Sequence, residues 1–126
     1  MNAAKKVLIV EDDKMSLDLM AAALEHAGVS TILVLNSTEA FDTLSQHSAE
    51  IGLALLDLSM PGLNGFELAR QIRTDPRFAK LPMVAVTASA THDAYQRAYD
   101  AGFDKVITKP YHPQRIFDLL AELKIT

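Results

Sequence analysis

The sequence lacks cysteine, an excess of basic residues and long hydrophobic runs. Because the 126-residue chain contains no cysteine, a disulfide framework, a thiolate zinc site and a cysteine nucleophile are excluded. Lys and Arg number 12 against 16 Asp and Glu, giving a net charge of −4, which argues against nucleic acid or an anionic lipid surface as a direct partner. No apolar run approaches the roughly 20 residues that cross a bilayer, and Lys5-Lys6 is not followed by the apolar stretch of a signal peptide. We therefore expect a cytoplasmic protein that contacts neither nucleic acid nor membrane.

The length of the chain indicates a single domain. Its hydrophobic content of 49% is enough for a normal core. No internal repeat, low-complexity tract or linker divides the sequence. We therefore expect one domain covering residues 1–126.

Short apolar runs recur along the chain, and each stops at polar residues. Their apolarity is continuous, which is typical of strands that are covered on both faces. We predict five strands from these runs: Val7–Val10, Thr31–Leu35, Leu53–Leu56, Met83–Val86 and Val106–Ile107.

The segments between these runs have helical spacing. The first predicted helix places an apolar stripe on Met15, Leu19, Ala22, Ala23 and Ala27, and the last places one on Ile116, Phe117, Leu120 and Leu123. Asn64 and Thr91 are candidate N-caps, and Gly28 and Gly102 are candidate helix stops. Strand and helix therefore alternate five times. This order predicts an open α/β sheet of five parallel strands with helices on both faces, since five strands are too few for a closed eight-stranded barrel.

Polar side chains follow these strands. Because parallel strands all point the same way, the residues after them gather at one edge of the sheet, where such folds bind ligands. The residues concerned are Glu11, Asp12, Asp57, Thr87 and Lys109. Three clustered carboxylates repel one another unless a cation is present. Magnesium is favoured over zinc, since the ligands are oxygens and none of the four histidines lies at a strand end.

Asp57 is the best candidate for a nucleophile at this edge. It ends the central and most apolar strand, and a carboxylate can attack phosphorus to form an acyl phosphate. Phosphoryl transfer needs mainly positioning and cations, which the metal and Lys109 would supply. The sequence therefore predicts a site that can hold a phosphoryl group.

Four short segments in this order together resemble the receiver domain of two-component response regulators, and the resemblance covers essentially the whole chain. The segments are Val10-Glu11-Asp12-Asp13, Leu56-Asp57-Leu58-Ser59-Met60-Pro61-Gly62-Leu63-Asn64-Gly65, Val86-Thr87-Ala88 and Thr108-Lys109-Pro110. The resemblance implies a flavodoxin-like receiver fold with strand order 2-1-3-4-5, similar to a stand-alone, chemotaxis-regulator-like receiver.

The resemblance also implies the roles of the site residues. Asp57 is expected to accept phosphate from a histidine kinase or a histidine phosphotransfer protein. Glu11 and Asp12 correspond to the family's acidic pair, and Asp12, Asp57 and the backbone carbonyl of Ser59 would hold Mg2+. Thr87 and Lys109 would contact the phosphoryl oxygens. The chain would be a switch and not an enzyme, with limited self-phosphorylation from small donors and with autodephosphorylation.

One position departs from the family pattern. Family members often carry an aromatic residue three positions before the lysine, and here that position is Val106. A valine has few rotamers and no ring to move, so the output is expected to use Phe103, Tyr111 or the fourth helix. The chain ends soon after the last predicted helix, so we expect no output domain and an effect through an unknown downstream protein.

Two other functions remain open at this stage. The chain is alternatively a receiver-like interaction module that works without phosphate, which the absence of an aromatic residue at Val106 leaves open. It is also alternatively a phosphohydrolase that passes through an aspartyl-phosphate. Such enzymes generally place a second Asp two residues after the nucleophile, where this sequence has Ser59.

Overall fold

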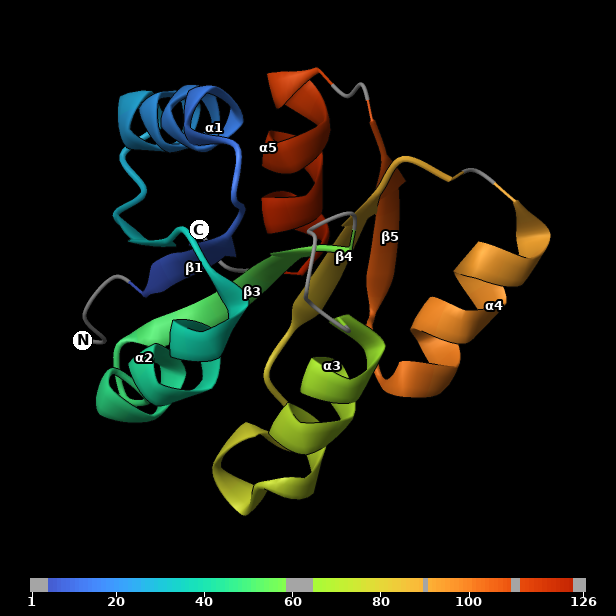
Figure 1. Ribbon diagram of the computed structural model, residues 1–126. Coiled ribbons are helices and arrows are strands. Elements are labelled where there is room, and N and C mark those ends of the chain that lie inside the picture. The colour runs from blue at the N-terminus through green and yellow to red at the C-terminus, as the bar shows by residue number, and fades with distance from the viewer. Residues whose placement is uncertain (1–4, 59–64, 90, 110–111, 124–126) are drawn as a thin grey trace.

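The computed structural model describes residues 5–58, 65–89, 91–109 and 112–123 (Figure 1). Its sheet has five parallel strands in the order β2-β1-β3-β4-β5, which confirms the predicted order. The strands are β1 (Lys6–Val10), β2 (Thr31–Val34), β3 (Ile51–Asp57), β4 (Met83–Thr87) and β5 (Lys105–Thr108).

Helices cover both faces of this sheet, as predicted. The α-helices are α1 (Lys14–His26), α2 (Ala40–Gln46), α3 (Gly65–Thr74), α4 (His92–Ala101) and α5 (Pro113–Glu122), with short 3-10 helices at Ser37–Glu39 and Pro76–Phe78. Figure 1 shows α1 and α5 on one face and α2, α3 and α4 on the other. Among the described residues, every helix is too short or too polar to cross a membrane.

Each central strand contributes side chains to two hydrophobic cores, one on each face of the sheet. In β1, Leu8 and Val10 pack into the core under α2, α3 and α4, whereas Val7 and Ile9 pack into the core under α1 and α5. Successive side chains of a strand point to opposite faces, so a strand between two cores must be apolar at every position. This is why the runs that predict the strands do not alternate.

The helix predicted after β1 is present as α1, but the apolar stripe read from the sequence is not the face that packs on the sheet. Met15 and Leu19 are 73% and 67% exposed, and the helix instead buries Leu17, Met20 and Leu24, together with Ala21. Both sets have helical spacing, but the buried set contains more large apolar side chains than one made mostly of alanines. Burying the larger area stabilises the fold more, so this set faces the sheet.

The helix ends agree with the predicted signals where the structure describes them. The Thr91 side chain accepts a hydrogen bond from the Ala94 backbone N–H and caps α4. Gly102, at φ 109°, follows α4 in the left-handed region that glycine adopts without strain. Gly28, at φ 85°, follows the end of α1. Asn64 lies outside the described residues.

Arg73 of α3 bonds to residues just before β4 and β5, at the edge of the sheet where the strands begin. Its guanidinium, 19% exposed in the side chain, donates to the carbonyls of Gly102, Phe78 and Leu81 at 2.9, 2.9 and 2.6 Å. It also pairs with Asp104, whose carboxylate accepts from the first N–H of β4. One side chain therefore joins α3 to the starts of β4 and β5.

Candidate functional site

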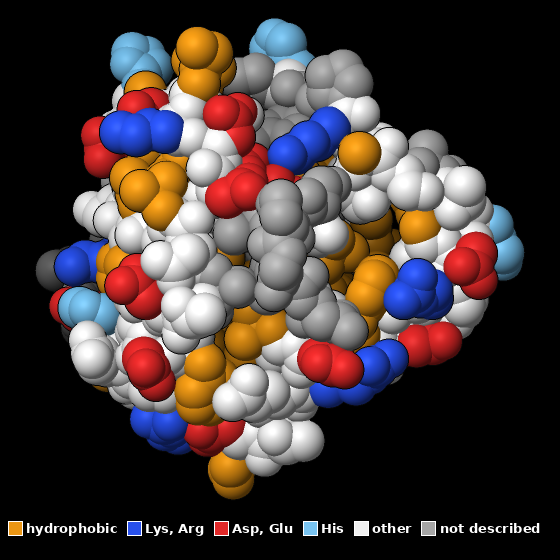
Figure 2. All heavy atoms as spheres, in the orientation of Figure 1, with side chains coloured by type: hydrophobic (Ala, Val, Ile, Leu, Met, Phe, Trp, Pro, Cys, Tyr) orange, Lys and Arg blue, Asp and Glu red, His pale blue; other side chains and the backbone are white. Residues whose placement is uncertain are grey.

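The polar residues of the predicted site gather at the carboxyl ends of the strands. Val10 is paired with Leu56, so Glu11, the next residue after β1, comes beside Asp57 at the end of β3. Pairing of Thr87 with Thr108 brings Lys109 to the same edge. Figure 2 shows acidic and basic side chains meeting on this face. Parallel pairing thus assembles residues that are nearly one hundred positions apart in the chain.

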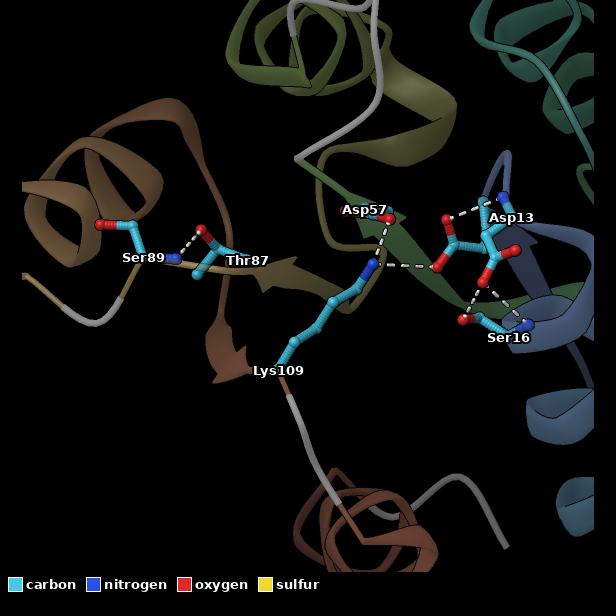
Figure 3. A network of polar contacts seen from close by, with 7 residues as sticks. Asp13, Ser16, Asp57, Thr87, Ser89 and Lys109 are labelled. Carbon is cyan, nitrogen blue, oxygen red and sulfur yellow. Dashed lines mark hydrogen bonds and ion pairs between the residues drawn. The ribbon is translucent and has the colours of Figure 1, made fainter.

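Lys109 lies between two buried carboxylates (Figure 3). Its Nζ is 2.7 Å from Asp57 Oδ2 and 3.2 Å from Glu11 Oε1. The side chains of Asp57 and Glu11 are 3% and 7% exposed, and that of Lys109 is 29% exposed. Charge-assisted hydrogen bonds in such a poorly hydrated place are strong. The ammonium group therefore holds the carboxylates in one cluster.

Burial and charge shift the pKa values in this cluster. Burial, reinforced by the neighbouring Asp57 carboxyl, raises the pKa of Glu11 from 4.5 to about 7, against the opposing effects of the Asp13 N–H and of Lys109. Burial alone would lower the pKa of Lys109, but its bonds to Asp57 and Glu11 outweigh this and raise the pKa above its usual value. The site thus carries more negative charge than one ammonium group neutralises.

The carboxylates of Glu11, Asp12 and Asp57 offer oxygen atoms that lie within 4.8 Å of one another. Within the described ranges this is the one group of three or more acidic or histidine side chains with such spacing. Oxygen ligands of this kind suit a hard divalent ion such as magnesium, and Asp12 is exposed and open to it. Ser59, whose carbonyl the sequence assigns to the metal, lies outside the described residues.

Asp13, which is not among the predicted site residues, caps α1 and orients the Glu11 carboxylate. Its carboxylate caps α1 by accepting from the Ser16 hydroxyl at 2.6 Å and from the Ser16 N–H at 3.3 Å. Its own N–H donates to Glu11 Oε2 at 3.2 Å and so orients that carboxylate. An Asp immediately before a helix is a recognisable N-cap signal, so this role is readable from the sequence.

Thr87 is buried at the end of β4, but its hydroxyl does not face the carboxylates. Its Oγ1 accepts a hydrogen bond from the Ser89 N–H at 3.0 Å. Figure 3 shows this hydroxyl directed to Ser89 and away from Asp57 and Lys109. The structure therefore brings Glu11, Asp12, Asp57 and Lys109 together and leaves the Thr87 hydroxyl turned aside.

Comparison with known families agrees with this geometry. Residues 7–121 match the model of the response regulator receiver domain. The chain belongs to the response regulator receiver domain family. The predicted family and the predicted function are confirmed at this level, because a receiver domain is the phosphoaccepting switch of a response regulator. The family is one of signalling domains and not of classical enzymes.

The curated relatives of this receiver domain differ in length: the match covers half of one and nearly all of another. It is 33% identical to the phosphate regulon transcriptional regulatory protein PhoB of Pseudomonas aeruginosa over 120 residues. This match covers 95% of this chain and 50% of PhoB. The chain thus spans about half the length of PhoB. It is 30% identical over 116 residues to the polar-differentiation response regulator DivK of Brucella anthropi, covering 92% of this chain and 93% of DivK.

Solved structures share the fold of this receiver domain. The signal receiver domain of a DNA-binding response regulator from Colwellia psychrerythraea superimposes with a TM-score of 0.86 at 27% identity, covering 97% of this chain and 99% of that one. The chemotaxis protein CheY4 of Vibrio cholerae has a TM-score of 0.88 at 22% identity, covering 96% and 99%.

Val106 occupies a buried position in this receiver domain. It is 7% exposed and belongs to the same core as Ala98 and Phe103. Phe103 is itself 3% exposed, so its side chain is part of the core and not of the surface. Tyr111, the other aromatic residue considered for the output, lies outside the described residues. Val106 and Phe103 thus share the core with α4, and the route by which the output is read stays a prediction.

Proposed function

We propose that Asp57 accepts a phosphoryl group from a histidine kinase or a histidine phosphotransfer protein. The observation that carries the proposal is the ion pair at 2.7 Å between Lys109 Nζ and a 3% exposed Asp57, inside a cluster of three carboxylates. Ion pairs in a purely structural role do not require two further carboxylates, which repel one another. A divalent ion and an incoming phosphoryl group explain why the cluster carries this charge.

The donor in this reaction is a phosphorylated imidazole. A carboxylate oxygen of Asp57 attacks phosphorus and forms a P–O bond while the P–N bond breaks. The electron pair of that bond stays on the imidazole nitrogen, which takes up a proton from solvent. Phosphoryl transfer depends mainly on positioning and on positive charge near the phosphoryl oxygens. Lys109, already within 2.7 Å of the carboxylate, is placed to supply such a charge.

Residues of this chain fit the metal that the family generally binds. Asp12 and Asp57 would hold Mg2+ together with the Ser59 carbonyl, and Glu11 would act beside them directly or through water. When bound, the metal neutralises charge on the carboxylates and on the phosphoryl oxygens. The roles of the described residues are then separate: Asp57 is the nucleophile, Lys109 the fixed cation, and Thr87 a hydroxyl that must turn from Ser89 to reach the phosphoryl group.

The phosphorylated state would end when water attacks the phosphorus and releases phosphate, which restores the Asp57 carboxylate. Small phosphodonors would load the same carboxylate slowly. Moving a two-state surface from 1:99 to 99:1 needs about 5.5 kcal/mol of differential stabilisation. New charge-assisted hydrogen bonds from Lys109 and Thr87 to the phosphoryl oxygens would supply a large part of it. The changed surface would bind a downstream protein.

A phosphorylation assay tests this proposal. The protein is mixed with Mg2+ and acetyl phosphate, and its intact mass and peptide map are measured. We expect one added phosphoryl group, stable in acid and labile in alkali, on the peptide that contains Asp57. Chelation of Mg2+ and Asp57→Asn should each abolish the adduct, whereas Asp42→Asn, at an exposed position in the first turn of α2, should leave it unchanged. A protein that stays unmodified while a known receiver is loaded in parallel contradicts the proposal.

The two alternatives predict different results. A module that works without phosphate would bind its partner equally well as wild type and as Asp57→Asn. A phosphohydrolase would release phosphate from a phosphate ester over many turnovers. We expect neither outcome. The acidic cluster and Lys109 suit one phosphoryl group bound to Asp57, and Ser59 offers no carboxyl group as the general acid that repeated hydrolysis needs.

A further inference from the structure

A cleft of about 420 Å³ opens at the edge of the sheet where the strands begin. One side is the turn after α2 and the start of β3, and the other is the segment that leads from α3 to β4 (yellow in Figure 1). The lining residues are Ser48, Ile51, Gly52 and residues 76–82. Because β3 is seven residues long, the cleft lies about 20 Å from Asp57 at the other end of that strand. Its volume is in the range of small-molecule sites.

The wall on the β4 side is held in place by the fold itself. Pro76 begins the 3-10 helix, and Pro82 directly precedes β4. Proline fixes its own φ angle, so both ends of the segment have little freedom. From behind, Arg73 donates to the carbonyls of Phe78 and Leu81 at 2.9 and 2.6 Å. The cleft is therefore preformed, which lowers the entropy that a ligand must lose or impose on binding.

The lining combines apolar surface with positive charge. Ile51 and Phe78 are buried in the core under the cleft, and Leu81 is partly buried against the same core. Among the described residues that line the cleft, the charged ones are both cations, Arg77 and Lys80. The whole chain carries a net charge of −4, so the charge of this cleft is opposite to that of the protein. Such a lining suits a ligand with an apolar body and an anionic group.

Arg77 offers a donor in a fixed position. Its Nε and Nη2 donate to the Asp75 carboxylate at 3.1 and 2.7 Å, and Nη2 also donates to Ser45 Oγ at 3.1 Å. The guanidinium carbon lies 4.9 Å from the centre of the Phe78 ring, at cation–π distance. The two N–H groups of Nη1 have no acceptor in the described chain. Lys80 is exposed and, within the same ranges, has no ion pair or hydrogen bond, so its charge is available to a ligand.

A small molecule suits this cleft better than a protein partner does. Specific protein interfaces bury more than about 1,000 Å² and have a central cluster of large apolar or aromatic side chains. In the described chain, the exposed large hydrophobic residues are Met15, Leu19, Leu33, Leu35 and Tyr99, and none of them lines the cleft. The cleft therefore lacks the apolar surroundings that a protein partner would cover.

We propose that the cleft binds a small organic anion with an apolar body. The anionic group, a carboxylate or a phosphate, accepts hydrogen bonds from Arg77 Nη1 and Lys80 Nζ, and the apolar part lies on Ile51 and Leu81. This site shares no residue with the acidic cluster and does not depend on phosphorylation of Asp57. It is a second ligand site that goes beyond the proposed function.

Titration of the isotope-labelled protein with benzoate, followed by NMR of the backbone amides, tests this inference. We expect saturable shifts at Ser48, Ala79 and Lys80, with a Kd of about 1–10 mM for so small a ligand. Benzamide has the same shape without the charge, and acetate has the charge without the ring. Each should bind at least about fivefold more weakly than benzoate. Phenyl phosphate should bind at the same amides, and its affinity relative to benzoate identifies the preferred anionic group.

Variants of the two cations show whether they hold the ligand. Lys80→Gln and Arg77→Gln should each weaken benzoate binding about fivefold or more. Lys14→Gln, which removes an exposed ammonium on α1, should leave the Kd unchanged. Amide signals away from the cleft should match those of the wild type in every variant, which separates lost binding from unfolding. Loading of Asp57 by acetyl phosphate should be the same in Lys80→Gln as in the wild type, because the two sites are separate.

Three results would overturn the proposal. Benzoate shifts that do not saturate, or that are as large around Lys14 as around Lys80, would mean attraction to surface charge alone. Equal benzoate affinity in Lys80→Gln and in the wild type would remove the cation from the site. Tighter binding of the peptide acetyl-Glu-Glu-Phe-Glu-Glu-amide, with shifts well outside the cleft, would assign the surface to a protein partner in place of a small molecule.

Discussion

Removal of the charge of Lys109 should destabilise the protein by an amount that depends on pH. Lys109→Met keeps the apolar part of the side chain and leaves Asp57 and Glu11 without their cation. Removing one partner of a buried ion pair typically costs about 3–5 kcal/mol. Because Lys109 itself is 29% exposed, we expect the lower end, about 3 kcal/mol at pH 8 without Mg2+.

The cost should be smaller at pH 6. Glu11, whose pKa is raised to about 7, then holds a proton, and one negative charge fewer is left unpaired. We expect a loss of about 2 kcal/mol or less at pH 6, and Mg2+ should restore part of the stability at pH 8 by returning positive charge to the cluster.

Urea unfolding followed by circular dichroism measures this difference. With an m-value of about 1.5 kcal/mol/M, the midpoint of the variant should fall by about 2 M at pH 8. The control is Lys14→Met, which removes an ammonium 72% exposed and paired with Asp18 at 3.0 Å; it should lose less than about 0.5 kcal/mol at both pH values. Equal losses at pH 6 and pH 8, or a Lys109 variant as stable as the control, would refute the charge balance described for the site.

Three further results are expected. The pKa of Glu11 is about 7 in the fold and 4.5 in its ordinary state, so the metal-free protein should lose stability as the pH rises from 4.5 to 7. If Mg2+ binding needs an ionised Glu11, the Mg2+ affinity measured by calorimetry should fall about tenfold per pH unit below 7. An affinity that does not change with pH would argue against a need for ionised Glu11. Arg73→Ala should cost about 3–4 kcal/mol in urea unfolding because three carbonyls and a carboxylate lose a charged donor, whereas Arg77→Ala, 48% exposed, should cost under about 1 kcal/mol. Leu17→Ala should lower the free energy of unfolding by about 2–5 kcal/mol. Leu19→Ala, at a 67% exposed position, should lower it by less than about 0.5 kcal/mol. The reverse order would mean that the face of α1 with Leu19 is the buried one.

The sequence predicts the fold and most of the site because both follow from strand direction. Once the apolar runs are assigned to parallel strands, the residues after them must share one edge, and Glu11, Asp57 and Lys109 then meet whatever the details of the helices. The cluster of three carboxylates likewise implies a cation from charge alone. These conclusions depend on topology and composition, which are visible in the residue pattern.

Orientation is what the pattern does not carry. Helix α1 has two apolar stripes, and only its packing against the sheet decides that Leu17 and Leu24 are buried while Met15 and Leu19 face solvent. The direction of the Thr87 hydroxyl depends on a rotation about one bond, and the Ser89 N–H that fixes it is a backbone group common to nearly all residues. The orientation of the Thr87 side chain is therefore known only from the coordinates.

A crystal structure of the protein with Mg2+ and beryllofluoride is the most direct test of the site. We expect beryllium bound to a carboxylate oxygen of Asp57, the metal held by Asp12 and Asp57, and Lys109 Nζ and the Thr87 hydroxyl both in contact with fluorine atoms. Beryllofluoride that is missing from Asp57 under conditions that load a known receiver, or carboxylates of Asp12 and Asp57 that turn away from each other with the metal unbound, would contradict this account.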